Sequence, residues 1–184
     1  VPTATPTPTP MIEATGELKV DAVKKLVSAE TPLQAGQFEF ELIEIKDKTE
    51  NVIQTQSNDA EGKVEFAPIS YQLNGEKNDL GTHKYKVREV KGDAAGYTYD
   101  DTIYTINVTV EDAGNGTLTV TPVIHSSKAT SEDATVTGME FTNTYTTSGQ
   151  IALGATKTLE GQTLEAEQFS TRRCDDNHVT CRNA

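Results

Sequence analysis

The sequence has few of the residues that usually stabilise a small domain, such as cysteines that form disulfides and large aromatic side chains. Its 184 residues include no tryptophan, 6% aromatic residues and two cysteines, and Cys174 and Cys181 both lie close to the C-terminal end. A disulfide framework therefore cannot cross-link the body of the chain. With 35% hydrophobic residues, a domain of this size buries only a modest core. The sequence also lacks the apolar run of about 18 residues that a membrane-spanning helix needs, and the basic and apolar regions of a signal peptide.

Basic residues are scarce as well. The chain carries 16 basic and 28 acidic side chains, which give a formal net charge of −12. Polyanions are repelled by most of such a surface, so we expect neither a nucleic-acid partner nor binding to an anionic membrane. A chain that starts at Val1 rather than at a methionine is expected to be a piece of a longer protein.

Alternating apolar and polar residues dominate the segment from about residue 16 to residue 145. Polar turns separate the alternating stretches, which are centred on residues 18–22, 38–42, 64–66, 85–87, 104–110, 118–120 and 139–141. About seven short strands at this spacing, rich in threonine and valine, predict an all-β fold, an antiparallel β-sandwich. Ahead of them, proline at every second position from Pro6 to Pro10 favours a polyproline II spacer.

An internal repeat divides the chain. The sequence AVKKL at residues 22–26 leads to LQAGQF at 33–38, and ATKTL at 155–159 leads to LEAEQF at 164–169, so Lys24 matches Lys157. The second copy begins near Gln150, and the sequence after Ser170 does not continue it. We expect a linker at residues 1–13, a sandwich domain at 14–147 and a truncated second repeat with an aberrant tail at 148–184. Lys157 has no glutamate or asparagine partner in that truncated copy, so we predict that its amine stays free.

Strand parity places three polar residues on apolar faces. Lys24 shares a face with Leu18, Val20, Ala22 and Leu26, whereas Lys25 is on the opposite face. By the same rule Glu89 shares a face with Tyr85 and Val87, and Asn143 shares a face with Met139 and Phe141. A lysine, a glutamate and an asparagine therefore occupy positions at which leucine is expected.

Three interpretations of these residues remain open from parity alone. Lys24 and Glu89 could form a buried ion pair with Asn143 as a hydrogen-bond partner. Alternatively, all three could lie at half-buried strand ends from which their polar tips reach water. The third interpretation is covalent: desolvation leaves the Lys24 amine uncharged, and the amine attacks the Asn143 carboxamide. Ammonia leaves and an isopeptide bond remains, with Glu89 as the acid that polarises the carbonyl and shuttles protons.

The chain resembles the streptococcal pilin isopeptide-linkage domain of Gram-positive surface proteins. The resemblance rests on VKKLVSAETPLQAGQFEFEL, YKVREVKGDAAGYTYDDTIYTINVTV and MEFTNTY, which together span about residues 18–145. It implies an immunoglobulin-like sandwich of about seven strands with a self-generated cross-link between its first and last strands. In that family pattern Lys24 supplies the amine, Asn143 the carboxamide and Glu89 the proton-shuttling acid. With the resemblance added, the covalent interpretation is favoured over the ion pair.

Other polar clusters give weaker signals. Cys174, His178 and Cys181 have the spacing C-x3-H-x2-C, but a closed zinc site needs four ligands and a supporting framework. We therefore expect no metal and no cofactor. Asp100-Asp101 and Glu111-Asp112 do not belong to a spaced calcium loop, so we expect solvated turn and edge charges there.

These observations predict a structural module of a Gram-positive pilus or other cell-surface protein, located outside the cell. Its expected partners are neighbouring repeats or pilin subunits. The alternative is an adhesin domain of the same fold that binds a host protein or glycan through its loops, for which segment 70–82 is the longest candidate. A turnover enzyme is disfavoured, because the one reactive set of residues, Lys24, Glu89 and Asn143, would be used up by its own single reaction. The sequence contains no sortase signal of the LPxTG kind.

Overall fold

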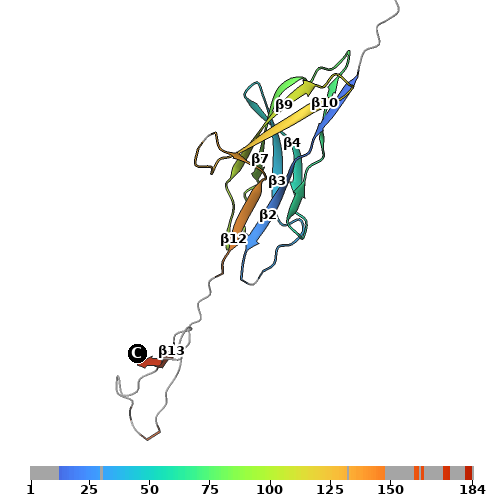
Figure 1. Cartoon of the computed structure of the whole chain (residues 1–184). Coiled ribbons are helices and arrows are strands. Elements are labelled where there is room, and N and C mark those ends of the chain that lie inside the picture. Colours follow the sequence, from blue (N-terminus) through green and yellow to red (C-terminus); the bar gives the residue numbers. More distant parts are fainter. Residues whose placement is uncertain are drawn as a thin grey trace, which may run out of the picture. The chain divides into compact units, whose positions relative to one another are not determined.

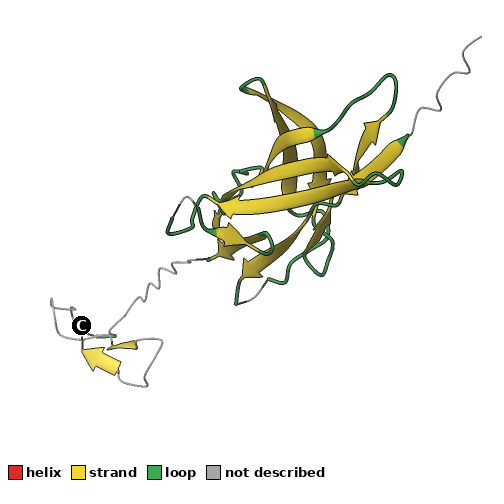
Figure 2. Cartoon of the chain, turned by 45° about the horizontal axis from the view of Figure 1, so that its top comes forward, coloured by secondary structure: helices red, strands yellow, loops and turns green. Residues whose placement is uncertain are grey.

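The computed structural model describes residues 13–29, 31–131, 133–147, 160–161, 163, 172–174 and 181–183. The chain divides into two compact units, residues 1–147 and residues 148–184. In the described residues the first unit consists of strands and loops without a helix, which confirms the predicted all-β class (Figures 1 and 2). Accordingly, the part of the chain that is described contains no helix long and apolar enough to cross a membrane.

The larger sheet of the first unit has six antiparallel strands in the order β11-β10-β9-β7-β3-β4. The strands are β3 (Glu39–Lys46), β4 (Thr49–Ser57), β7 (Gly81–Glu89), β9 (Ile103–Asp112), β10 (Leu118–Ser126) and β11 (Thr135–Val136). Strand β7 lies between β3 and β9, so both edges of β7 are hydrogen-bonded. This central position fixes the direction in which the side chains of β7 point.

A four-stranded sheet in the order β5-β2-β12-β8 packs against the larger one. Its strands are β2 (Asp21–Val27), β5 (Lys63–Glu65), β8 (Tyr97–Thr98) and β12 (Glu140–Tyr145), and a separate pair consists of β1 (Ala14–Leu18) and β6 (Ile69–Leu73). Strands β2 and β12 run parallel, in a register that pairs Lys24 with Phe141 and Leu26 with Asn143. The beginning and the end of the domain therefore lie side by side at the centre of one sheet (Figure 1).

The core fills the space between these sheets with the residues that alternation predicts. Phe40 and Val87 of the larger sheet and Val64 and Phe141 of the smaller one are fully buried. The rings of Phe40 and Phe141 meet across the sandwich with their centroids 5.1 Å apart. The apolar faces of the two sheets therefore form one contiguous core.

The structure contains more strands than the alternation predicts, twelve among the described residues of the first unit instead of about seven. The stretch from Leu18 to Leu26 is not one strand, because the chain leaves β1 at Leu18 and joins a different sheet as β2 at Asp21. Likewise, segment 70–82 is not one long loop, since β6 extends to Leu73 and β7 begins at Gly81. In the second unit, β13 (Arg172–Cys174) pairs with β14 (Cys181–Asn183).

Candidate functional site

Three strands from both sheets bring the predicted polar residues together. Lys24 lies in the middle of β2 and Asn143 near the end of β12, on the same inward face of the smaller sheet. Glu89 is the last residue of β7 and enters the core from the larger sheet. The structure therefore places Lys24, Glu89 and Asn143 in one cluster.

The cluster is a continuous chain of hydrogen bonds. The Lys24 Nζ donates to Glu89 Oε2 at 2.6 Å, and the Asn143 Nδ2 donates to Glu89 Oε1 at 2.5 Å. The side chains of Lys24 and Glu89 are both 0% exposed, and Asn143 as a residue is also 0% exposed. This burial excludes the half-buried arrangement in which the polar tips reach water. The carboxylate of Glu89 thus contacts both prospective reactants.

Aromatic rings surround the lysine. The Lys24 Nζ lies 4.5 Å from the centroid of the Phe38 ring and 5.9 Å from that of Phe40. Phe40 is the cross-strand neighbour of Glu89 on β3, and Phe141 is the neighbour of Lys24 on β12. The strand register itself therefore places an apolar group beside each charged residue, and water is excluded from the pair.

Desolvation dominates the ionisation of the pair. Burial lowers the pKa of the Lys24 ammonium, although the hydrogen bond and charge of Glu89 oppose the change. Burial also raises the pKa of the Glu89 carboxyl, against the opposing hydrogen bonds from Lys24 and Asn143. Both shifts favour a neutral amine beside a neutral acid. A neutral amine is a nucleophile, and a protonated carboxyl can deliver a proton.

Hydrogen bonds also fix the orientation of the Asn143 amide. Its Nδ2 faces the Glu89 carboxylate, and its Oδ1 accepts the backbone N–H of Asp100 at 2.7 Å. The reverse orientation would set an N–H group of the amide against the Asp100 N–H, so that two donors face each other. We predict from sequence that Glu89 polarises the Asn143 carbonyl. In this geometry Glu89 instead contacts the amide nitrogen of Asn143, and the Asp100 N–H contacts the carbonyl oxygen.

Asp100 itself differs from the expectation of a solvated charge. Its side chain is 8% exposed, whereas that of Asp101 is 90% exposed. Burial would raise the pKa of Asp100, but hydrogen bonds from Lys128, Thr102 and the Thr142 N–H outweigh it and hold the pKa below its usual range. Asp100 and Asp101 are adjacent and identical in the sequence, and only tertiary packing makes their environments differ.

The neighbouring lysine shows how specific the placement is. Lys25 is on the outer face of β2, where its Nζ lies 2.6 Å from Glu140 and its side chain is 57% exposed. Strand parity predicts this difference between Lys24 and Lys25. Lys157, Cys174 and His178 do not enter the comparison, because Lys157, His178 and the side chain of Cys174 lie outside the described part of the structure.

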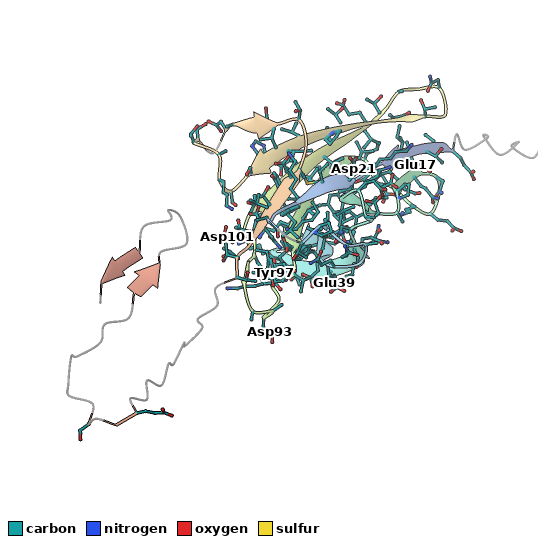
Figure 3. All side chains as sticks on the ribbon, turned by 90° about the horizontal axis from the view of Figure 1, so that it is seen from below. Glu17, Asp21, Glu39, Asp93, Tyr97 and Asp101 are labelled. Atoms are coloured by element: carbon teal, nitrogen blue, oxygen red, sulfur yellow. The ribbon has the colours of Figure 1, made fainter. Side chains whose placement is uncertain are left out.

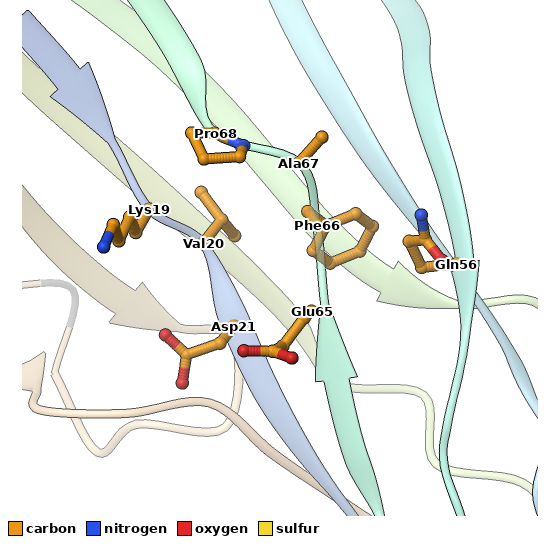
Figure 4. A pocket seen from close by; sticks show the side chains of 8 residues that line it. All are labelled: Lys19, Val20, Asp21, Gln56, Glu65, Phe66, Ala67 and Pro68. Atoms are coloured by element: carbon orange, nitrogen blue, oxygen red, sulfur yellow. The ribbon is translucent and has the colours of Figure 1, made fainter.

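Four hollows on the described part of the surface are lined by neither Lys24 nor Asn143. The hollow in Figure 4 has a volume of about 520 Å³ and lies beside β2 and β5. It is open and lined by a mixture of charged and apolar side chains, including Lys19, Asp21 and Glu65. Among the described residues, His, Cys, Asp and Glu side chains form no group of three or more that could hold a metal ion.

Comparison with known proteins identifies the family. A family model of the Spy0128-like isopeptide-containing domain matches residues 20–146. Among solved structures, the major pilin of Streptococcus pyogenes is 19% identical with a TM-score of 0.42, over 70% of this chain and 50% of that one. The T-13 major pilin of the same species is 16% identical with a TM-score of 0.45, over 73% and 54% of the respective chains. The chain therefore spans about half the length of these pilins. A search of curated proteins found no match.

The matched segment contains the whole cluster of Lys24, Glu89 and Asn143 and covers most of the sandwich. It confirms the resemblance that the three sequence segments indicate. The chain belongs to the family of Spy0128-like isopeptide-containing domains.

Proposed function

We propose that this chain is a structural module that cross-links itself through an isopeptide bond between Lys24 and Asn143. The observation that supports the proposal is the buried chain of hydrogen bonds in which one carboxylate contacts both reactants, at 2.6 and 2.5 Å. Glu89 acts as the acid and proton shuttle. The reaction occurs once per molecule, so the domain is its own substrate and is not a turnover enzyme.

The reaction balances within the cluster. Glu89 first takes a proton from the Lys24 ammonium, and the free amine attacks the Asn143 carboxamide carbon. The new C–N bond forms as the bond to the amide nitrogen breaks, and ammonia leaves. Of the three ammonium protons, one stays on the new amide nitrogen, one departs with the ammonia and one remains on Glu89. Burial favours that neutral product form of Glu89.

The cross-link would join the two neighbouring parallel strands through which the chain enters and leaves the domain. Tension that enters along β1 and β2 passes from Lys24 to Asn143 and leaves at the end of β12 (Figure 1). The residues between 24 and 143 then carry none of it. The closed loop of about 120 residues would also stabilise the fold by about 5 kcal/mol in the chain-entropy model.

A covalent bond of this kind suits a position outside the cell, on the surface or pilus of a Gram-positive bacterium. Unlike a disulfide it is not reducible, and the described sandwich contains no cysteine. The expected partners are neighbouring repeats or pilin subunits of the same assembly. The matched solved structures are described as major pilins of Streptococcus pyogenes, which agrees with this setting.

The adhesin alternative has no specific observation in its favour. It predicts an exposed aromatic patch or a long insertion between strands. Among the described residues, the large hydrophobic side chains with the greatest exposure are aliphatic: Val23, Val27, Val52, Ile53, Leu80, Ile103 and Val123. Strands β6 and β7 occupy both ends of segment 70–82, so only residues 74–80 connect them.

Intact mass spectrometry of the purified chain tests the proposal. We expect a mass lower than that of the sequence by one ammonia. Lys24→Ala and Glu89→Ala should each restore the full mass and lower the free energy of unfolding by about 5 kcal/mol or more, since the cross-link is lost. Lys25→Ala is the matched control, because Lys25 is adjacent in sequence but on the outer face, and it should keep the ammonia loss. An unmodified mass for the folded wild-type chain would refute the proposal.

A further inference from the structure

We propose that the backbone N–H of Asp100 is the oxyanion donor for this reaction, and that the Asp100 carboxylate is the clamp that aims it. This inference rests on the proposed function. Its starting point is the 2.7 Å hydrogen bond from the Asp100 nitrogen to Asn143 Oδ1, the oxygen on which negative charge develops when the amine attacks. Glu89 contacts the other end of the same carboxamide.

The strand order explains why this N–H is available. Strand β8 pairs with β12 through Thr98 and Thr144 and through Tyr97 and Tyr145, and it then ends. Continued in the same register, residue 100 would fall opposite Thr142. There the Asp100 side chain replaces the missing strand, since its Oδ2 accepts the Thr142 N–H at 2.7 Å. The backbone of Asp100 is thereby released from the sheet ladder and its N–H is directed at the Asn143 side chain.

Further contacts hold the Asp100 carboxylate in place. Its Oδ1 accepts the Thr102 N–H at 2.9 Å, the Thr102 hydroxyl, and the Lys128 Nζ at 2.7 Å. With the Thr142 N–H, four donors therefore converge on a side chain that is 8% exposed. Such a set of contacts orients the peptide unit far more than an exposed turn would require. The clamp therefore preorganises the donor before any charge develops on Asn143.

The donor completes the stabilisation that Glu89 alone does not provide. When the Lys24 amine adds to the carboxamide carbon, the carbonyl oxygen becomes an oxyanion in a buried site. The Asp100 N–H would stabilise that oxygen while Glu89 protonates the departing nitrogen. The two tasks then belong to two groups on opposite ends of the Asn143 amide.

Replacing the amide nitrogen of residue 100 by an ester oxygen tests the donor directly. The full chain is made by cell-free translation with the α-hydroxy analogue of aspartate at position 100, and aliquots are quenched in denaturant and weighed for ammonia loss. We expect cross-linking to slow by about a hundredfold, while protease resistance shows that folding still occurs. The same ester at Asp101 is the matched control and should react at the wild-type rate.

Asp100→Asn tests the clamp, because an amide offers one acceptor oxygen where the carboxylate offers two. We expect ammonia loss to slow by at least about tenfold, and Asp101→Asn to leave the rate unchanged. Wild-type rates for the ester chain at residue 100 would overturn this inference while leaving the cross-link intact. Absence of ammonia loss from the wild-type chain would instead overturn the proposed function and this inference with it.

Discussion

Removing one member of the Lys24–Glu89 pair should give the domain a pH dependence whose sign depends on which member is removed. Lys24→Met and Glu89→Gln are near-isosteric changes, and Asn143→Ala is the reference. None of the three variants can form the cross-link, so the comparison isolates ionisation. In Asn143→Ala the pair holds one proton when unfolded between the ordinary pKa values of 4.5 and 10.5, and it holds one when folded in the interior of that range, because burial brings the two pKa values closer together. The pair then contributes no slope there.

Lys24→Met leaves Glu89 buried without its cation. Burial raises the pKa of Glu89, and the loss of Lys24 removes groups that oppose this rise. The folded-state pKa then lies above the unfolded one, so the stabilising contribution is complete below about pH 4.5 and is lost as pH rises through the folded value. The free energy of unfolding should fall by about 1.4 kcal/mol per pH unit in that window, relative to Asn143→Ala.

Glu89→Gln should show the opposite slope. Burial lowers the pKa of Lys24, and the carboxylate that opposes the shift is gone. The folded-state pKa then lies below the unfolded one, so the contribution is complete above about pH 10.5 and is lost as pH falls through the folded value. The expected slope is again about 1.4 kcal/mol per pH unit, with stability now greatest at high pH.

Urea unfolding followed by circular dichroism, from pH 5 to pH 10 at constant ionic strength, measures all three slopes. The other titratable groups, Asp100 included, are common to the variants and cancel in the differences. Parallel curves for the three variants would mean that water reaches the pair and screens both groups. The desolvation on which the reactivity depends would then be absent, and the reasoning from burial would fail.

Two further predictions concern strand β2. Gly62→Ala should lower the free energy of unfolding by about 2 kcal/mol or more and reduce the cross-linked fraction, because φ is +88° and a Cβ would lie 2.1 Å from the Lys24 carbonyl oxygen. Gly36→Ala is the control: φ is +73° but the space around it is open, so the loss measured by urea unfolding should be about 1 kcal/mol. Asp21→Lys should stabilise by a few tenths of a kcal/mol, because Asp21 lies directly opposite Glu65 in the β2–β5 pair; thermal melts at low salt check this, and an unchanged melting temperature would contradict it.

Strand parity predicts the inward positions of the cluster because one face of each strand is buried. Side chains alternate with period two, so a position that continues an apolar series must enter the core whatever its chemistry. Lys24, Glu89 and Asn143 are all placed correctly by this rule. It holds even where the strand breaks between Leu18 and Asp21, because Val20 stays buried through the change of sheet.

Strand β4 could not be found in the same way. It is an edge strand of nine residues in which every side chain is exposed except that of Gln54, which is half-buried, so it carries no apolar alternation. The turn that precedes it is equally unmarked. Asp47 and Lys48 both have positive φ, at 52° and 66°, without the glycine or asparagine that usually marks a two-residue hairpin. Pairing with β3 stabilises both features, and pairing is a tertiary property.

The burial and contacts of Asp100 could not be predicted for a related reason. Nothing local distinguishes it from Asp101, since both carboxylates follow Tyr99 in an apparently polar turn. The difference arises because β8 ends two residues earlier and leaves the Thr142 N–H of β12 without a strand partner on that side. Figure 3 shows Asp101 and Tyr97 at this end of the sandwich, away from Glu17 of β1.

The proposed reaction depends on folding, because the three residues of the cluster are far apart in sequence. Glu89 lies 65 residues from Lys24 and 54 residues from Asn143, so the unfolded chain has no local means of desolvating the amine or protonating the acid. A one-residue slip of β2 would expose Lys24 and turn Asp21 and Lys25 inward, which costs an unpaired buried charge. Only the native register therefore activates the amine. Under the proposed function, a strongly acidic chain with a modest core needs its noncovalent stability only until the bond forms, after which the bond would itself preserve the register that made it.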